Sequence, residues 1–135
     1  MSSGPPLTSL LASLDPLRVD GEYVFVSSDA PLSVTLYATI REAEGLTSVL
    51  ERRDADRIGL AYDFVAGWIT LGVRSDLAAV GLTAAVSSAL AEAGISCNVL
   101  AGLHHDHLLV PIERVQRALE VLHGLAAMSR TTVDN

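Results

Sequence analysis

The sequence predicts an α+β protein built from ferredoxin-like βαββαβ units, in which an antiparallel sheet carries helices on one face. Three observations carry this prediction. Residues 68–74 alternate apolar and polar side chains, which is typical of a strand. Residues 81–93 then place apolar side chains at helical spacing and stop at Gly94. Residues 95–100 and 108–111 are extended and apolar, and a second amphipathic helix follows them.

The part of the chain before residue 67 predicts a shorter version of the same arrangement. A helix is expected over residues 7–14, between two proline-containing breaks. Asp20 and Gly21 are a turn signal that precedes the first strand. A hairpin turn at residues 42–45 separates the next two strands. The strands are expected over residues 22–28, 34–41 and 46–51, followed by a short helix over residues 52–58 and an extended segment over residues 60–65.

The expected division of the chain lies near residue 66, at a turn formed by Ala66 and Gly67. The length of 135 residues suits one domain, or two small halves that share one sheet or pack two sheets together. The apolar side of the last helix ends near Met128. The expected parts are an N-terminal helix and lead-in (1–19), a shortened first half (20–66), a second half (67–127) and a frayed tail (128–135).

The charge of the chain disfavours nucleic-acid and anionic-membrane partners. The formal net charge is −7, and the nine basic residues are all arginine. Nucleic-acid binders usually carry a clustered basic face, whereas these arginines are scattered. One group of three alternates with acidic residues and is interpreted as a solvated helix face rather than an anion site; it contains Arg52, Arg53 and Arg57 among Glu51, Asp54 and Asp56.

A cytoplasmic location is expected from the cysteine content and from the N-terminus. Cys97 is the only cysteine, so no internal disulfide can form, and it is interpreted as a core thiol. The N-terminal residues lack the basic start and apolar run of a signal peptide. No apolar run approaches the roughly 18–20 residues that span a bilayer, so no membrane partner is expected.

The strongest candidate for a ligand site is the segment that enters the central helix, residues 75–83. The first N–H groups of a helix lack internal partners and carry partial positive charge. Gly81 has no Cβ, so a carboxylate can approach these groups closely, and Thr83 adds a hydroxyl. The alternative is that Ser75 or Asp76 caps the turn and that Gly81 only permits close packing. The sequence leaves both open.

The segment His104-His105-Asp106-His107 contains residue types that bind metals, but its spacing does not predict a complete metal site. In an extended conformation His105 and His107 share one face, so only two ligands converge. A solvated turn is the preferred interpretation, with Asp106 reaching the ammonium group of a ligand. Neither a metal nor another cofactor is therefore expected.

Two further features of the predicted sheet bear on binding. Asn98 lies in the strand after the central helix, where its amide either bonds across strands or meets a ligand. A sheet face bearing Trp68, Thr70 and Gly72 is expected to be exposed and to form the surface of a homodimer.

Several segments of this chain resemble the ACT domain, and in particular small stand-alone bacterial ACT-domain proteins. The resemblance covers roughly residues 21–122. It is carried by Ala38-Thr-Ile-Arg-Glu-Ala-Glu-Gly-Leu-Thr47, Trp68-Ile-Thr-Leu, Gly81-Leu-Thr-Ala-Ala-Val, Leu90-Ala-Glu-Ala-Gly-Ile-Ser96 and Asp106-His-Leu-Leu-Val-Pro111.

What the resemblance implies is a βαββαβ fold used twice and a site for a small amino acid at an interface between two units. Such domains pass ligand binding on to an enzyme or regulator. The residues matching the family's ligand site are the helix-entry residues Asp76, Gly81, Leu82 and Thr83, the facing-strand residue Asn98 and, by likeness to arginine sensors, Asp106. The chain departs from the regulatory pattern because no catalytic domain is attached and the first half is shortened.

The sequence and this resemblance therefore predict a non-enzymatic regulatory module that binds a small molecule and forms a homodimer. The expected small molecule is an amino acid. The alternative is a structural or interaction protein whose ligand site no longer works. A third interpretation, ranked below these two, is a small enzyme that uses the histidine cluster with a metal.

Overall fold

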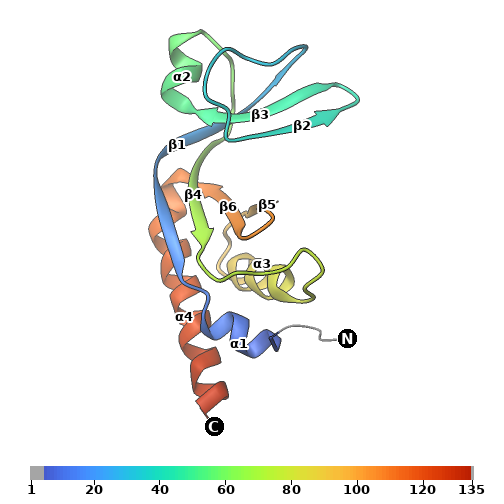
Figure 1. Cartoon of the computed structure of the whole chain (residues 1–135). Coiled ribbons are helices and arrows are strands. Elements are labelled where there is room, and N and C mark those ends of the chain that lie inside the picture. Colours follow the sequence, from blue (N-terminus) through green and yellow to red (C-terminus); the bar gives the residue numbers. More distant parts are fainter. Residues whose placement is uncertain (1–4, 135) are drawn as a thin grey trace.

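The computed structural model describes residues 5–134 and contains a six-stranded antiparallel sheet with strand order β2-β3-β1-β4-β6-β5 (Figure 1). Residues 1–4 and 135, the ends of the expected lead-in and tail, lie outside the described residues. The strands are β1 (Pro16–Ser28), β2 (Ala38–Glu42), β3 (Gly45–Glu51), β4 (Val65–Leu71), β5 (Asn98–Ala101) and β6 (Asp106–Pro111). The helices are α1 (Leu7–Ala12), α2 (Arg52–Arg57), α3 (Leu82–Glu92), the 3₁₀ turn η1 (Ile112–Arg114) and α4 (Val115–Asp134).

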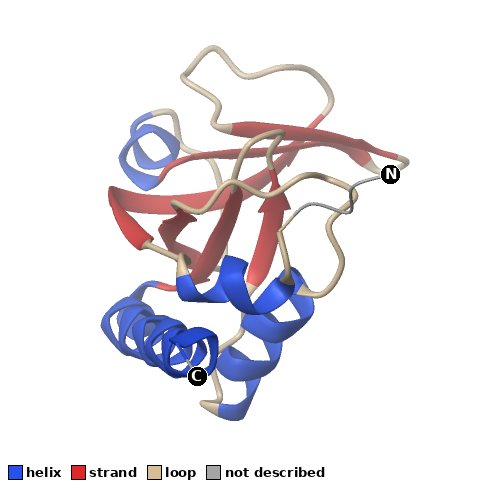
Figure 2. Cartoon of the chain, turned by 60° about the horizontal axis from the view of Figure 1, so that its bottom comes forward, coloured by secondary structure: helices blue, strands red, loops and turns tan. Residues whose placement is uncertain are grey.

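The helices cover one face of the sheet, as predicted. Ile69 and Leu108 pack in one buried cluster with side chains of α1, α3 and α4. Figure 2 shows these three helices on one side of the sheet. Ala55 of α2 packs with Val24, which pairs with Val65 of β4. Since side chains alternate along β4, those of Val65 and Ile69 lie on the same face. The fold class is therefore confirmed as α+β and ferredoxin-like.

The two central strands belong to both halves of the chain. β1 pairs with β3 through residues 23–28 and with β4 through residues 16–19 and 23–24. The strands β2-β3-β1-β4 make the order of one ferredoxin-like unit, and β1-β4-β6-β5 make the order of a second. Of the two arrangements that the sequence left open, the structure has the single shared sheet.

Two predicted turns are wrong, because the glycines that suggested them lie inside strands. Asp20 and Gly21 belong to a bulge of β1: the register shifts between Val19 and Tyr23, so residues 20–22 oppose Gly67 alone. Gly67 itself lies in the middle of β4. An ideal Cβ on Gly67 would stand 2.1 Å from Val115 Cγ2, so this glycine allows α4 to approach the sheet rather than breaking the strand.

The first half lacks the helix that would follow β1 in a complete unit. Residues 29–37 form an irregular connection, and the strand expected over residues 34–41 begins only at Ala38. Val34 and Leu36, two of the alternating apolar side chains that suggested a longer strand, instead pack with Leu32 against the buried cluster around Val24. The prediction of a shortened first half is consistent with this connection.

The frayed tail expected from Met128 is wrong within the described residues, because α4 continues to Asp134. Ser129 is only 7% exposed, and its hydroxyl donates to the carbonyl of Leu125. Arg130 donates from Nη1 to the carbonyl of Ala12 at 3.0 Å, which joins α4 to α1. The sequence of α4 alone does not show that α1 packs beside its last turns. None of the helices within residues 5–134 combines the length and the apolar character needed to cross a bilayer.

Candidate functional site

The entrance of α3 presents backbone N–H groups that no side chain caps within the described residues. Gly81 is the N-cap residue with φ of +100°, a conformation that glycine adopts without strain. The first turn of α3 contains no acidic residue. Thr83 is exposed, so the second position of the helix faces solvent. Unpaired amides with the positive end of a helix dipole suit a carboxylate or another anion.

Leu7 of α1 lies against this entrance. An ideal Cβ on Gly81 would stand 2.9 Å from Leu7 Cδ2, and Leu7 is 36% exposed. Gly81 therefore has the packing role that the sequence kept open beside the ligand role. Leu82 is 2% exposed and belongs to the helix-side core, so it offers a ligand its backbone N–H rather than its side chain.

Two acidic residues lie at the corner of the sheet where the loop to α3 leaves the end of β4. Asp76 is exposed in the loop that leads into α3, and its carbonyl, not its side chain, accepts the N–H of Ala79. Asp106 starts β6 beside the end of β4, because the next residue, His107, pairs with Thr70. The Ser75 N–H donates to the His104 carbonyl at 3.3 Å, which joins the two loops.

Asn98 is not brought to this corner. It pairs with Leu109, whereas Asp106 pairs with Ala101 at the other end of the same two strands. The side chain of Asn98 lies on the face of Leu109, which is the face without helices, and Asp106 alternates onto the helix-covered face. Residue spacing alone does not show this, because the strand that was expected from Ile95 begins at Asn98.

Each histidine of residues 104–107 contacts a different partner. His104 Nδ1 lies 2.9 Å from Arg74 Nη2, and His105 Nδ1 lies 3.3 Å from the Val73 carbonyl. His107 points to the face without helices, where its Nδ1 is 3.0 Å from Thr70 Oγ1. Across residues 5–134, no three His, Cys, Asp or Glu side chains are gathered as metal ligands. His105 precedes β6, which begins at Asp106, so the extended conformation in which His105 and His107 would share a strand face is not present.

The sequence did not identify an aromatic cluster on the face without helices. Tyr23 and Tyr37 lie at centroid distances of 5.2 and 5.9 Å from Trp68, and the His107 ring lies 5.5 Å from it. Trp68 is only 8% exposed, so the expectation of an exposed face bearing this residue is wrong. Tyr37 covers Trp68 because the irregular connection before β2 places it there. The homodimer itself stays a prediction.

Acid is expected to destabilise the protein through His107. Burial and the nearby His105 lower the pKa of His107, while Asp106 opposes them. Its pKa in the unfolded chain is about 6.5, so below that value the unfolded state binds more protons and the folded state loses stability. Urea unfolding at about pH 7.5 and about pH 5.5 should show this loss, and His107→Gln should reduce it. An unchanged pH dependence in the variant would contradict the assignment.

Cys97 lies partly buried against the helix-side core. Burial raises the pKa of its thiol to about 11, so the thiol stays protonated at neutral pH. A protonated thiol is a poor nucleophile, which agrees with the interpretation of Cys97 as a core residue.

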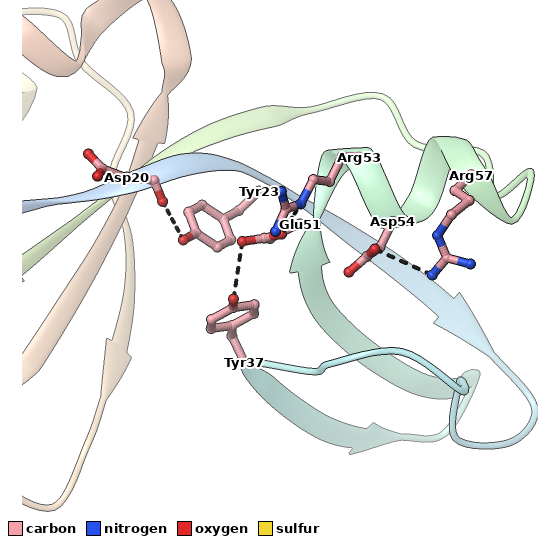
Figure 3. Close-up of polar contacts among 7 residues, drawn as sticks. All are labelled: Asp20, Tyr23, Tyr37, Glu51, Arg53, Asp54 and Arg57. Atoms are coloured by element: carbon pink, nitrogen blue, oxygen red, sulfur yellow. Dashed lines mark hydrogen bonds and ion pairs between the residues drawn. The ribbon is translucent and has the colours of Figure 1, made fainter.

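The arginines around α2 are paired with neighbouring carboxylates at the surface. Arg52 Nη1 lies 2.9 Å from Glu22 Oε1, and Arg53 Nε lies 2.6 Å from Glu51 Oε2. Figure 3 shows the second pair beside Tyr37, whose hydroxyl donates to Glu51. These contacts agree with the interpretation of a solvated, charged surface.

Comparison with known proteins gives two family matches that together span most of the chain. Residues 5–67 match one ACT domain model, and residues 64–124 match another. No curated protein matches the chain.

Solved structures give the same fold. A crystal structure of a Vibrio cholerae protein of unknown function, described as a possible transport protein, is 46% identical, covers 89% of this chain and 95% of its own, and has a TM-score of 0.82. The aspartokinase α and β subunits are 15% identical over 82% of this chain and 96% of theirs, with a TM-score of 0.61. The regulatory subunit of aspartate kinase from Thermus thermophilus is 9% identical over 83% of this chain and 92% of its own, with a TM-score of 0.57.

Proposed function

Because the chain belongs to the ACT domain family, we propose that this protein is a regulatory module that senses an amino acid in the cytoplasm and catalyses no reaction itself. ACT domains are regulatory ligand-binding modules. The observation that carries the proposal is the entrance of α3, where the first amides have no side-chain cap within the described residues. Asp76 lies in the loop that leads to this entrance, and Asp106 lies beside the end of β4 where that loop starts.

The amino acid places its carboxylate against the N–H groups of Leu82 and Thr83, next to Gly81. Its ammonium group meets Asp76 or Asp106 at the same corner. Each charge of the ligand then has an opposite charge or dipole in reach, and charge-assisted hydrogen bonds of this kind are about twice as strong as neutral ones. Asn98 takes no part, since it lies on the other face of the sheet.

Regulation requires that the ligand bind one arrangement of the protein better than another. We assign the change of arrangement to Leu7, because it lies on Gly81 and is the most exposed leucine of α1. Occupation of the α3 entrance then shifts α1, or the contact with a second copy of the chain in a homodimer. That shift is what a regulated enzyme or other partner protein detects.

A thermal-shift panel of the standard amino acids tests the proposal. A ligand that binds the native state alone raises stability by about 2.7 kcal/mol at a concentration of 100 times its Kd. We expect one amino acid, or a few related ones, to raise Tm while the others do not. If none raises Tm, the alternative of an interaction protein is favoured, and the contact of Leu7 with Gly81 is then the closure of a site that no longer works.

A further inference from the structure

The two edge strands of the sheet, β2 and β5, differ in charge. Within the described residues β2 pairs only with β3, and β5 pairs only with β6. β2 carries the exposed charges of Arg41 and Glu42, which is one way in which soluble proteins keep an edge from pairing with another chain. Residues 93–103, which include β5, contain no charged residue and no proline. The β5 edge therefore lacks the protection that the β2 edge has.

The hairpin between β5 and β6 determines which backbone groups of β5 face outward. The Gly102 N–H donates to the His105 carbonyl at 2.9 Å, so these two residues form a hydrogen-bonded pair. Hydrogen-bonded and non-hydrogen-bonded pairs alternate along an antiparallel ladder. In the register of β5 with β6, Val99 and Ala101 therefore direct their N–H and C=O groups away from β6. These groups are a template on which another strand can pair.

The surroundings of β5 leave the edge accessible to another chain. α3 lies beneath β5 (Figure 1), and Val99 packs against the cluster that contains Leu90 of α3. Apart from Glu92 at its end, the exposed residues of α3 have short side chains; they are Thr83, Ala84, Ser88 and Ala91. The helix therefore does not hold a second chain away from the edge. Leu103, just beyond β5, is 70% exposed, so the apolar character continues past the strand.

A second copy of this chain suits the β5 edge better than a flexible peptide does. The formal net charge of −7 makes two copies repel each other, and an uncharged edge is where this repulsion is weakest. Ordering a flexible peptide costs about 1–2 kcal/mol per residue, whereas a strand already held in a sheet avoids most of that cost. β5 has four residues, so its backbone hydrogen bonds, at about 0.5–1.5 kcal/mol each, do not offset the ordering of a peptide.

We propose that the β5 edge pairs with the β5 edge of a second copy, in antiparallel orientation about a two-fold axis. With Leu100 on the axis, Val99 of each copy exchanges backbone hydrogen bonds with Ala101 of the other. The two Leu100 side chains then lie opposite each other on the face without helices, as an apolar cross-strand pair. This pairing gives the homodimer a surface other than the Trp68 face, and it requires no ligand at the entrance of α3.

Sedimentation velocity of the full-length protein at micromolar concentrations, without any amino acid, tests this pairing. Ala101→Pro is the decisive variant, because it removes an outward N–H from an exposed residue and leaves the bonds between β5 and β6 in place. We expect it to raise the dissociation constant of the dimer by at least about ten-fold, through the loss of one backbone hydrogen bond donor in each copy. Ala101→Ser keeps the N–H and should change this constant by less than about two-fold.

Hydrogen exchange of the wild-type protein supplies a test that does not depend on the folding of Ala101→Pro. The amides of Val99 and Ala101 should exchange at least about ten-fold more slowly in concentrated solution than in dilute solution, because pairing protects them only in the dimer.

Three results would overturn the proposal. One is a monomer at all concentrations, which leaves the β5 edge to a different protein. Another is a dimer in which the amides of Val99 and Ala101 exchange as fast as in the monomer. The third is equal dissociation constants for wild type and Ala101→Pro. None of these measurements involves an amino acid, so failure of the dimer and failure of the amino-acid site are told apart.

Discussion

Replacing Trp68 with alanine is expected to lower the free energy of unfolding by about 4 kcal/mol, the usual cost of removing a large aromatic side chain from a core. Trp68 is 8% exposed and contacts Tyr23 and Tyr37 on one side and His107 on the other. Trp68 therefore links Tyr23 of β1 and Tyr37 of the irregular connection to His107 of β6. Urea unfolding of wild type and variant measures the difference.

Trp68→Phe is the matched control. It keeps an aromatic ring in the cluster but removes the indole N–H, which donates to Thr70 Oγ1 at 3.1 Å. Loss of that hydrogen bond and of part of the ring costs about 1–2 kcal/mol. A loss below about 1 kcal/mol for Trp68→Ala would show that the cluster does not hold the two units together.

Gly67→Ala is expected to lower the free energy of unfolding by about 3 kcal/mol, because a methyl group there overlaps α4. The ideal Cβ would stand 2.1 Å from Val115 Cγ2 and 3.4 Å from Ile112 Cδ1. Both Gly67 and Val115 are buried, so neither the strand nor the helix can move away without opening the core. Chemical unfolding at equilibrium measures the loss.

Val115→Ala in the same chain should relieve the overlap. The loss of unfolding free energy in the double variant is expected to be smaller than the sum of the two single losses by more than about 1 kcal/mol. A coupling of this size is typical of residues in contact. Strictly additive losses would contradict the close approach of β4 and α4.

Most of the fold follows from local patterns of the sequence. Apolar alternation in residues 68–71 and helical spacing in residues 82–92 lie where β4 and α3 are found, and the hairpin at residues 42–45 lies between β2 and β3. What local patterns do not show is why a glycine is present. Local sequence predicts turns at Gly21 and Gly67, whereas Gly21 allows a bulge and Gly67 allows a helix to approach.

The candidate site likewise has features that local sequence patterns predict and features that they do not. The entrance at Gly81 and the positions of Asp76 and Asp106 follow from the order of the elements, which a βαββαβ pattern determines. The position of Asn98 depends on strand register, and the covering of Gly81 by Leu7 depends on a helix that precedes it by about seventy residues. Neither is visible in local spacing.

The central claim is that the amides at the start of α3 hold the carboxylate of an amino acid. Thr83→Asp places the protein's own carboxylate in the first turn, where it interacts favourably with the helix dipole by about 0.3–1 kcal/mol and competes with a ligand. Ser88→Asp adds the same charge in the middle of α3, at another exposed position. Both variants are expected to stay folded.

The measurement is calorimetric titration of wild type and both variants with the amino acid that the thermal-shift panel identifies. We expect Thr83→Asp to weaken binding by at least about ten-fold, the equivalent of one lost charge-assisted interaction of about 1.4 kcal/mol, and Ser88→Asp to bind as wild type does. Equal affinities for wild type and Thr83→Asp would contradict the claim, because a carboxylate held at the α3 entrance cannot be indifferent to a second one placed there.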